Sequence, residues 1–201
     1  MRTPVMNSPT LILASASPRR ADLLRQFEFD FLVVPSAVEE SSSEDLSAGE
    51  VAQLNAYRKA RAVSKRFPDA VTLGVDTVVA LGNTIFGKPA DLTDAERMVS
   101  ALQGKTHQVV TGVCLIHLRG HRQKIFYEQT GVTFRKLTAA QIRHYHREVN
   151  PLDKAGAYGI QEKSAVVVES ISGSFSNVAG LPMERLQTEL AGFGILQPAP
   201  R

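Results

Sequence analysis

The sequence has no tryptophan, only one cysteine and no long uninterrupted apolar segment. The lone Cys114 excludes an internal disulfide, and its place in the apolar run VVTGVCLI predicts a buried core residue. No stretch approaches the roughly 20 apolar residues that a membrane-spanning helix needs. The beginning of the chain, MRTPVMNSPT, carries proline and asparagine where a signal peptide needs a continuous apolar stretch. We therefore expect a cytoplasmic protein without a membrane partner.

The sequence also lacks a large excess of charge of one sign, because basic and acidic residues nearly balance and the net charge is only +3. This small basic excess does not indicate a nucleic-acid partner, and the sequence has no Lys/Arg-rich run with interleaved aromatic residues. The chain has 201 residues, of which 43% are hydrophobic. That length and composition fit one compact domain, so we expect a single domain over residues 1–201.

The spacing of apolar residues predicts alternating strands and helices. Strands are expected at 10–14, 29–34, 71–81, 108–118, 122–134 and 165–171, and helices at 18–27, 48–66, 93–103, 138–148 and 182–191. The early strand–helix–strand order predicts parallel pairing. Two strands separated by Arg119-Gly120-His121 predict an antiparallel hairpin. The fold class is therefore α/β with a mixed sheet.

Polar residues mark the starts of helices and the irregular segments. Thr93 with Glu96, and Thr138 with Gln141, have the spacing of capping boxes. The polar segment SSSEDLSAGE is expected to include a mobile loop, and the final QPAPR is expected to fray.

Residues 11–27, LILASASPRRADLLRQF, contain an electrostatic conflict. A buried strand leads to Ser17, a good N-cap, and to Pro18, which suits the first position of a helix. Arg19 and Arg20 then place two cations in the first helical turn, where the helix dipole disfavours each by roughly 0.3–1 kcal/mol. A bound anion would remove this conflict, so the sequence predicts an anion at the N-terminus of this helix.

Asp76 interrupts the apolar run VTLGVDTVVALG, which otherwise predicts a central strand. A carboxylate in such a run must be paired or must bind a cation. Strand alternation places Asp76 on one face with Gly74 and Val78, and Thr77 on the other face. Asp76 is either a structural residue that caps a neighbouring helix, or a metal ligand or general base; we favour the second interpretation.

Two further charged positions leave alternatives open. Lys59 lies in the middle of the apolar stripe of the helix expected at 48–66, so its ammonium either reaches out to solvent or meets an anion. Glu39 and Glu40 follow the apolar strand FDFLVVPSAV. They either solubilise a loop or, beside Asp76, complete a site for a hard cation.

The segment GNTIFGK imitates a phosphate-binding loop but lacks its essential parts. Pro89 stands where the motif needs Ser or Thr for magnesium, and the strand–loop–helix context is missing. Gly82-Asn83 instead predicts the tip of a hairpin. Lys88, between a glycine and a proline, is either a solvated loop lysine or a functional residue.

The glycine-rich run DKAGAYGIQ admits two interpretations. It is either a turn packed around Tyr158 or a wall that lines a ligand, with Gln161 able to read a base edge. The run GSFSNVAGLP predicts a similar turn before the last helix, where the role of Asn177 stays open. Serine-hydrolase and zinc-site motifs are absent from the sequence.

Taken in order, these motifs resemble the Maf family of nucleoside triphosphate pyrophosphatases, also named septum-formation inhibitors. The similarity runs from about residue 10 to about residue 192 and consists of SASPRR, EE, the helix lysine, GVDT, FGKP, GKTHQVVTGV, DKAGAYGIQ and GSFSNVAGLP. The resemblance implies the Maf/HAM1-like architecture, in which helices flank an elongated mixed sheet and a cleft lies between two lobes.

The resemblance also implies a reaction and its residues. The family cleaves a nucleoside triphosphate between its α and β phosphates, giving a monophosphate and pyrophosphate, with a divalent cation such as Mg²⁺ or Mn²⁺. Asp76 matches the catalytic acid, and with Glu40 it would hold the metal. The substrate-binding positions match Ser15, Arg19, Arg20, Lys59, Thr77, Lys88 and Gln161. Among these, Arg19, Thr77 and Gln161 resemble the subgroup that acts on dTTP and UTP, and modified pyrimidine nucleotides belong to the same substrate class.

The resemblance leaves two questions open. It is compatible with a homodimer, and the older family name keeps a second hypothesis, a non-catalytic nucleotide-binding regulator of cell division. One departure is visible, because Asn150-Pro151 stands where relatives often have Glu-Pro. This departure touches a loop and none of the matched site residues.

Overall fold

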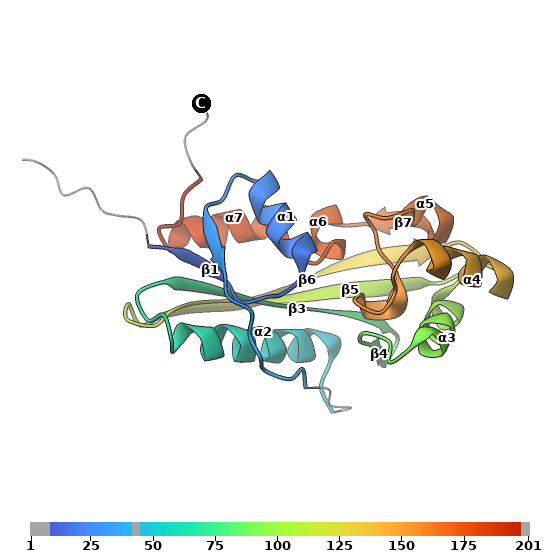
Figure 1. The fold of residues 1–201 in the computed structure, drawn as a ribbon, viewed down its shortest axis with the longest axis horizontal. Helices are drawn as coiled ribbons and strands as arrows, with labels where there is room; N and C mark the ends of the chain where they lie inside the picture. The colour runs from blue at the N-terminus through green and yellow to red at the C-terminus, as the bar shows by residue number, and fades with distance from the viewer. Residues whose placement is uncertain (1–8, 42–44, 198–201) are drawn as a thin grey trace, which may run out of the picture.

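The computed structural model describes residues 9–41 and 45–197, and within them a mixed sheet forms the centre of the molecule (Figure 1). Its strands are β1 (Leu11–Leu13), β2 (Phe31–Val33), β3 (Val71–Leu81), β4 (Thr84–Phe86), β5 (Thr106–His117), β6 (Arg122–Phe134) and β7 (Val168–Ser172). The strand order is β2-β1-β3-β5-β6-β7, and β4 pairs with β3. β1 is parallel to β2 and β3, and the other pairs are antiparallel, so the predicted mixed sheet is confirmed.

Helices cover the sheet on both faces (Figure 1). They are α1 (Pro18–Gln26), α2 (Ala48–Ser64), α3 (Leu92–Leu102), α4 (Ala139–Glu148), α5 (Ser164–Val167), α6 (Phe175–Val178) and α7 (Met183–Gly192), with a 3₁₀ turn η1 (Ala155–Ala157). The long helix α2 lies along one face of β3 and β5, whereas α1, α6 and α7 lie on the opposite side. Among the described residues, none of these helices has the length and apolar character to cross a membrane.

Both predicted hairpins form. β5 and β6 pair from Thr106–Thr133 to His117–Arg122 around the predicted turn. β3 and β4 close at Leu81–Thr84 around Gly82-Asn83, where Gly82 takes a φ of 58° that favours glycine. GNTIFGK is therefore a hairpin and not a phosphate-binding loop. Cys114 is buried in β5, as expected.

The structure corrects two local predictions. The capping box of Thr93 and Glu96 is wrong, because α3 begins one residue earlier and the carboxylate of Asp91 accepts a hydrogen bond from the Asp94 N–H (2.8 Å). Asp is at least as good an N-cap as Thr, which explains the shift. The last strand begins at Val168 and not at 165, because the preceding residues form the short helix α5. The capping box of Thr138 and Gln141 at α4 is confirmed.

Some expectations fall partly outside the described residues. Residues 42–44 of the expected loop, most of the segment expected to fray, and residues 1–8 are not described. Within the rest of the polar segment, Ser47 is the N-cap of α2 and forms a capping box with Glu50.

The sheet is interrupted along one edge of β3. On that edge β1 pairs with Val71–Leu73 and β4 pairs with Val79–Leu81, while β5 occupies the other edge. In the described part of the chain, residues 74–78 have no strand beside them on the β1 side. Side chains from both faces of this segment can therefore reach the same opening.

Two glycines set how closely α2 lies on the sheet. A Cβ added to Gly74 would lie 2.1 Å from the Ala56 carbonyl oxygen, and one added to Gly112 would lie 2.2 Å from the Ala52 carbonyl carbon. Neither glycine has room for a side chain, so α2 rests its backbone directly on β3 and β5. This contact sets the distance between β3 and the α2 side chains that face it.

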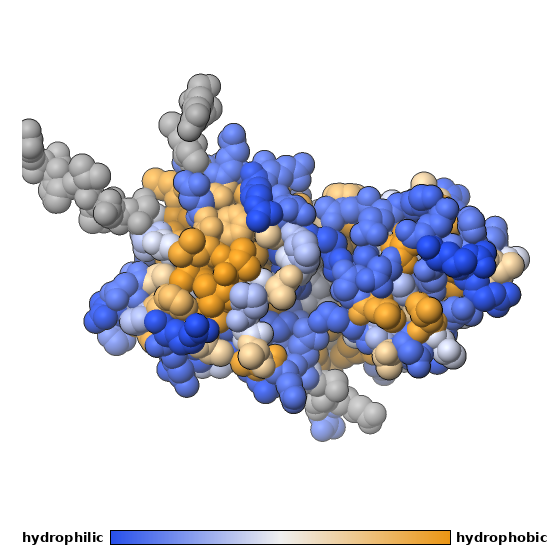
Figure 2. Space-filling model, in the orientation of Figure 1, coloured by the Kyte–Doolittle hydropathy of each residue, from blue (hydrophilic) through white to orange (hydrophobic). Residues whose placement is uncertain are grey.

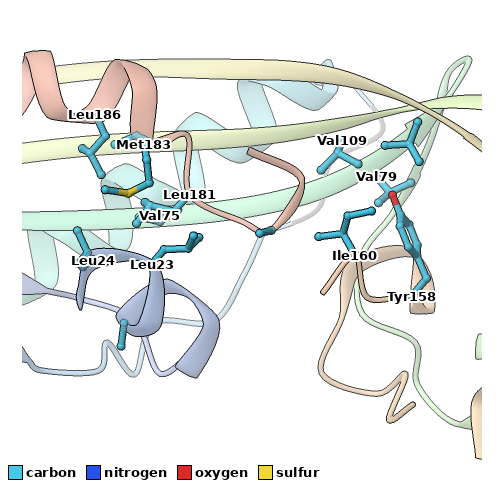
Figure 3. Packing of buried hydrophobic residues seen from close by; sticks show 14 of the residues in the cluster. Leu23, Leu24, Val75, Val79, Val109, Tyr158, Ile160, Leu181, Met183 and Leu186 are labelled. Carbon is cyan, nitrogen blue, oxygen red and sulfur yellow. The ribbon is translucent and has the colours of Figure 1, made fainter. Parts of the chain in front are cut away.

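Apolar side chains fill the opposite side of the sheet. Figure 3 shows one group in which Leu24 of α1 and Leu186 of α7 approach Val75, and a second group in which Tyr158 and Ile160 approach Val79 and Val109. These residues belong to one connected buried cluster. The core therefore supports the chain on both sides of the interrupted edge.

The outer strand β2 is short and apolar. It has only three residues, and Leu32 and Val33 are exposed. Figure 2 shows an apolar patch on the face of the molecule where this strand lies. The short length limits the hydrogen bonds that another strand could form with this edge.

Gly74→Ala tests the contact between α2 and the sheet. We expect the free energy of unfolding to fall by about 1–3 kcal/mol or more, because the added methyl group must push the α2 backbone away. Urea denaturation measures this change. Gly192→Ala at the end of α7 is the control, since an added Cβ there meets no atom within 4 Å. Equal stability of the two variants would contradict the close contact.

Candidate active site

The interrupted edge of β3 opens into a cleft of about 1250 Å³. A volume of this size exceeds the usual roughly 300–1,000 Å³ of small-molecule sites. The predicted site residues that line the cleft are Ser15, Arg19, Arg20, Glu40, Lys59, Asp76, Thr77 and Lys88. Residues far apart in the sequence therefore meet in one place.

Asp76 is held by two side chains of α2. The Lys59 ammonium donates to Asp76 Oδ1 (2.7 Å), and the Asn55 amide donates to Oδ2 (3.1 Å). Asn55 and Lys59 are four residues apart, so they lie one turn apart on the same helical face. Asp76 is only 4% exposed, and both of its oxygens have side-chain partners. The paired carboxylate agrees with the expectation for a charge in an apolar strand, and its partners are not the backbone of a helix N-terminus.

Lys59 joins Asp76 to a second carboxylate. Its Nζ also lies 2.8 Å from Glu40 Oε1, and its side chain is only 11% exposed. Lys59 therefore meets anions and does not extend into solvent. Lys88, in the loop after β4, donates to Glu40 Oε1 (2.9 Å) and Oε2 (3.2 Å). Charges of alternating sign thus run from Asp76 through Lys59 and Glu40 to Lys88.

Glu40 stays ionised because of these two lysines. Burial raises the pKa of Glu40, but the hydrogen bonds and charges of Lys59 and Lys88 outweigh burial and lower this pKa to about 2. At neutral pH the carboxylate is anionic and paired with both lysines. This supports the interpretation of Glu40 as more than a loop solubiliser.

Arg20 is a buried cation with neutral partners. Its Nε donates to the Gly180 carbonyl (3.0 Å), Nη1 to Ser15 Oγ (2.9 Å) and Nη2 to Thr77 Oγ1 (3.0 Å). Burial lowers the pKa of Arg20, while the nearby charge of Asp76 acts against this shift. Among the residues that the structure describes, Arg20 forms no direct ion pair. A buried guanidinium in this state favours an anionic ligand.

Arg19 instead has a carboxylate partner across the cleft. Its guanidinium donates to Asp153 Oδ2 (2.6 Å) and to the Asp153 carbonyl (3.1 Å). Asp153 also accepts from Lys154 (2.9 Å). At the start of α1, the Ser17 side chain forms no capping hydrogen bond. The unfavourable interaction between the helix dipole and the cations of the first turn is therefore offset by a carboxylate at Arg19 but not at Arg20.

The opposite face of β3 carries Thr77, as strand alternation predicts. Its hydroxyl contacts Arg20 and lies 3.0 Å from the hydroxyl of Thr111. Gln161 is exposed and does not line the cleft, although Tyr158 and Ile160 nearby do. Its role in reading a base stays a prediction.

Asn177 has a structural role that the sequence left open. Its amide is fully buried and donates to the Val109 carbonyl (3.1 Å) and to Thr130 Oγ1 (3.0 Å). These bonds attach α6 to β5 and β6. They give Asn177 a structural role, while its Oδ1 accepts no hydrogen bond from the described residues.

Asn55 and Asp153 are site residues to which no motif of the sequence assigns a role. The spacing of four residues between Asn55 and Lys59 is a usable signal, because it places both on one face of α2. No comparable signal links Asp153 to Arg19, since their contact joins segments 134 residues apart.

The donor set fits a cation that arrives with a polyphosphate. Among the described residues, no three His, Cys, Asp or Glu side chains gather to hold a metal ion. Asp76 and Glu40 are two carboxylates within reach of one ammonium. Mg²⁺ is commonly held by one or two carboxylates, with water and substrate phosphates as its other ligands. Asp76 and Glu40 match that kind of site in the type and number of their ligand groups.

Comparisons with known proteins point in one direction. Residues 10–193 match the family model described as Maf-like protein. A dTTP/UTP pyrophosphatase of Symbiobacterium thermophilum is 47% identical over 92% of this chain and 94% of its own. One from Deinococcus radiodurans is 43% identical over 96% of this chain and 97% of its own. The solved structure of a HAM1 protein from Coxiella burnetii has the same fold, with a TM-score of 0.52 and 16% identity over 92% of this chain and 99% of the other.

Lys59→Ala tests how strongly the buried charges depend on each other. We expect the free energy of unfolding to fall by about 3–5 kcal/mol, because Asp76 loses its cation while it stays buried. Lys88→Ala is the matched control and should lower it by about 1 kcal/mol or less, since Lys88 is exposed. Urea denaturation at pH 7 measures both. A similar loss of unfolding free energy in the two variants would show that the buried Asp76 does not depend on Lys59.

Proposed function

The chain belongs to the Maf family, and we propose that it hydrolyses nucleoside triphosphates to nucleoside monophosphates and pyrophosphate. The observation that carries this proposal is the buried Arg20, which lacks a carboxylate partner among the described residues and opens into the same cleft as Asp76 and Lys88. A polyphosphate supplies the missing anion. The names of the relatives support dTTP and UTP as its substrates.

Cations from three elements would bind the phosphate groups. Arg20 presents a guanidinium that neutral groups already orient, and it shares the Ser15 hydroxyl with the Ser17 N–H at the start of α1. Arg19 would exchange Asp153 for phosphate, because both are anions and the pair is partly exposed. Lys59 and Lys88 would neutralise the leaving pyrophosphate.

Asp76 would act on the attacking water. Its oxygens already accept one hydrogen bond each, and a carboxylate has further lone pairs to accept from water. The water oxygen forms a bond to the α phosphorus, and the bond from that phosphorus to the bridging oxygen breaks. The electron pair leaves with pyrophosphate, and the water proton passes to Asp76.

A divalent cation, Mg²⁺ or Mn²⁺, would be held by Asp76 and Glu40, and would supply charge neutralisation and a more acidic water. Glu40 is suited to this role because it is a partly exposed carboxylate in the same cleft as Asp76. Lys59 would hold the two carboxylates together.

The base would be selected on the other face of β3. Thr77 lies on that face, and Arg19 and Gln161 are the other two positions that resemble the dTTP/UTP subgroup. Gln161 is exposed, so it would contact the base from the rim of the cleft. Modified pyrimidine triphosphates fall in the same class.

Asp76→Asn tests the catalytic assignment. We expect turnover to fall by about 10²–10⁴-fold, because an amide does not accept the water proton. Pyrophosphate release from a panel of triphosphates with Mg²⁺ or Mn²⁺ measures this. Asp69→Asn is the matched control, since Asp69 pairs with Arg119 on the surface and does not line the cleft. Near wild-type turnover would remove Asp76 as the base, and orthophosphate as the product would refute the proposed reaction.

Gln161→Ala tests base selection. We expect the ranking of kcat/KM among UTP, dTTP and purine triphosphates to change, because the amide both donates to and accepts from a base edge. Gln123→Ala, an exposed residue of β6 outside the cleft, is the control. An unchanged ranking would refute this role of Gln161.

A further inference from the structure

We propose that Asn55 is a positioning residue that fixes Glu40 and Asp76 relative to each other. This inference deepens the proposed function and rests on it. Asn55 projects from α2 between the strand that carries Asp76 and the loop that carries Glu40. It does not need to touch the substrate to act.

The Asn55 amide makes contacts on two sides. Its Oδ1 accepts from the backbone N–H of Ser41 (2.8 Å), and its Nδ2 donates to the Ser41 carbonyl (3.0 Å). The same Nδ2 donates to Asp76 Oδ2 (3.1 Å). An amide nitrogen has two hydrogens, so both donations can be made together. Asn55 therefore binds the residue next to Glu40 and one oxygen of Asp76 at once.

Burial and chemistry both favour this role. Asn55 is only 3% exposed, and a buried amide without partners would destabilise the fold. Asparagine combines an acceptor with a two-hydrogen donor on a short side chain, which matches the two backbone groups of Ser41 and the Asp76 carboxylate. Aspartate has the same shape but cannot donate when ionised. The contact thus depends on the amide and not only on its volume.

The two carboxylates differ in how firmly their own elements hold them. Asp76 lies within β3, which pairs with β5 along almost its whole length. Glu40 lies in an irregular segment between β2 and α2, and its side chain is partly exposed. Asn55, which binds the Ser41 backbone, and Lys59, which contacts the Glu40 carboxylate, connect this segment to α2. Loss of Asn55 should move Glu40 and leave the phosphate-binding residues of α1 in place.

This separation predicts a specific kinetic pattern for Asn55→Ala. We expect kcat to fall by about 10–100-fold and the Mn²⁺ concentration for half-maximal activity to rise by a similar factor, as for other residues that orient metal ligands. The KM for dTTP should change by less than about twofold, because Arg19, Arg20 and Gln161 are untouched. Gln53→Ala, a residue of α2 outside the cleft, should leave all three quantities unchanged.

A second variant separates positioning from packing. Asn55→Asp preserves volume and the acceptor for the Ser41 N–H, but loses both donations. We expect kcat to be at least as low as in Asn55→Ala although the volume is kept, and the thermal unfolding midpoint to fall as well, because the new carboxylate lies beside Asp76 and the Ser41 carbonyl. Wild-type kcat in Asn55→Asp, or a rise in KM with kcat unchanged in Asn55→Ala, would overturn the proposal.

Two measurements without turnover keep this inference distinct from the proposed function. Electron paramagnetic resonance measures Mn²⁺ binding in the presence of a non-hydrolysable dTTP analogue, and hydrogen exchange measures protection of the Ser41 amide. Asn55→Ala should weaken Mn²⁺ binding and expose that amide. Unchanged values of both would refute the role of Asn55, whereas a wild-type protein that binds Mn²⁺ and analogue but releases no pyrophosphate would refute only the reaction.

Discussion

The ion pair between Lys59 and Asp76 is the interaction on which the site depends. Each charge is buried, so each requires the other, and together they attach α2 to the centre of the sheet. Gly74 makes the pair feasible, because it lets the α2 backbone approach within reach of β3. The same approach brings Asn55 to Asp76 and Glu40 to Lys59. Packing and electrostatics therefore specify one arrangement.

Much of the fold could be predicted because its main elements are long and strongly patterned. The strands over Val71–Leu81 and Arg122–Phe134 have the bounds expected from the sequence, and α2 differs only at its end. The short elements were missed or shifted. α5 and α6 have four residues each, too few for a helical period to appear, and their conformation depends on tertiary contacts such as those of Asn177.

The site could be predicted where a residue contradicts its surroundings. Asp76 in an apolar strand, Lys59 on an apolar stripe and Arg20 in a first helical turn each indicate a missing partner, and the structure brings them to one cleft. Asn55 does not conflict with the sequence around it, because polar residues are common in helices. Gln161 carries no local signal beyond the family resemblance, and its exposed position leaves its role a prediction.

The gap in strand pairing along one edge of β3 has a consequence for how such a protein can change. Neighbouring residues of one strand point to opposite faces, yet here Asp76 and Thr77 border the same opening. In the proposed reaction, one of them serves bond cleavage and the other serves choice of base. Under that proposal, replacement of Thr77 would change the choice of base while Asp76 stays held by Lys59 and Asn55 of α2. Adjacent codons would then evolve under separate selective pressures.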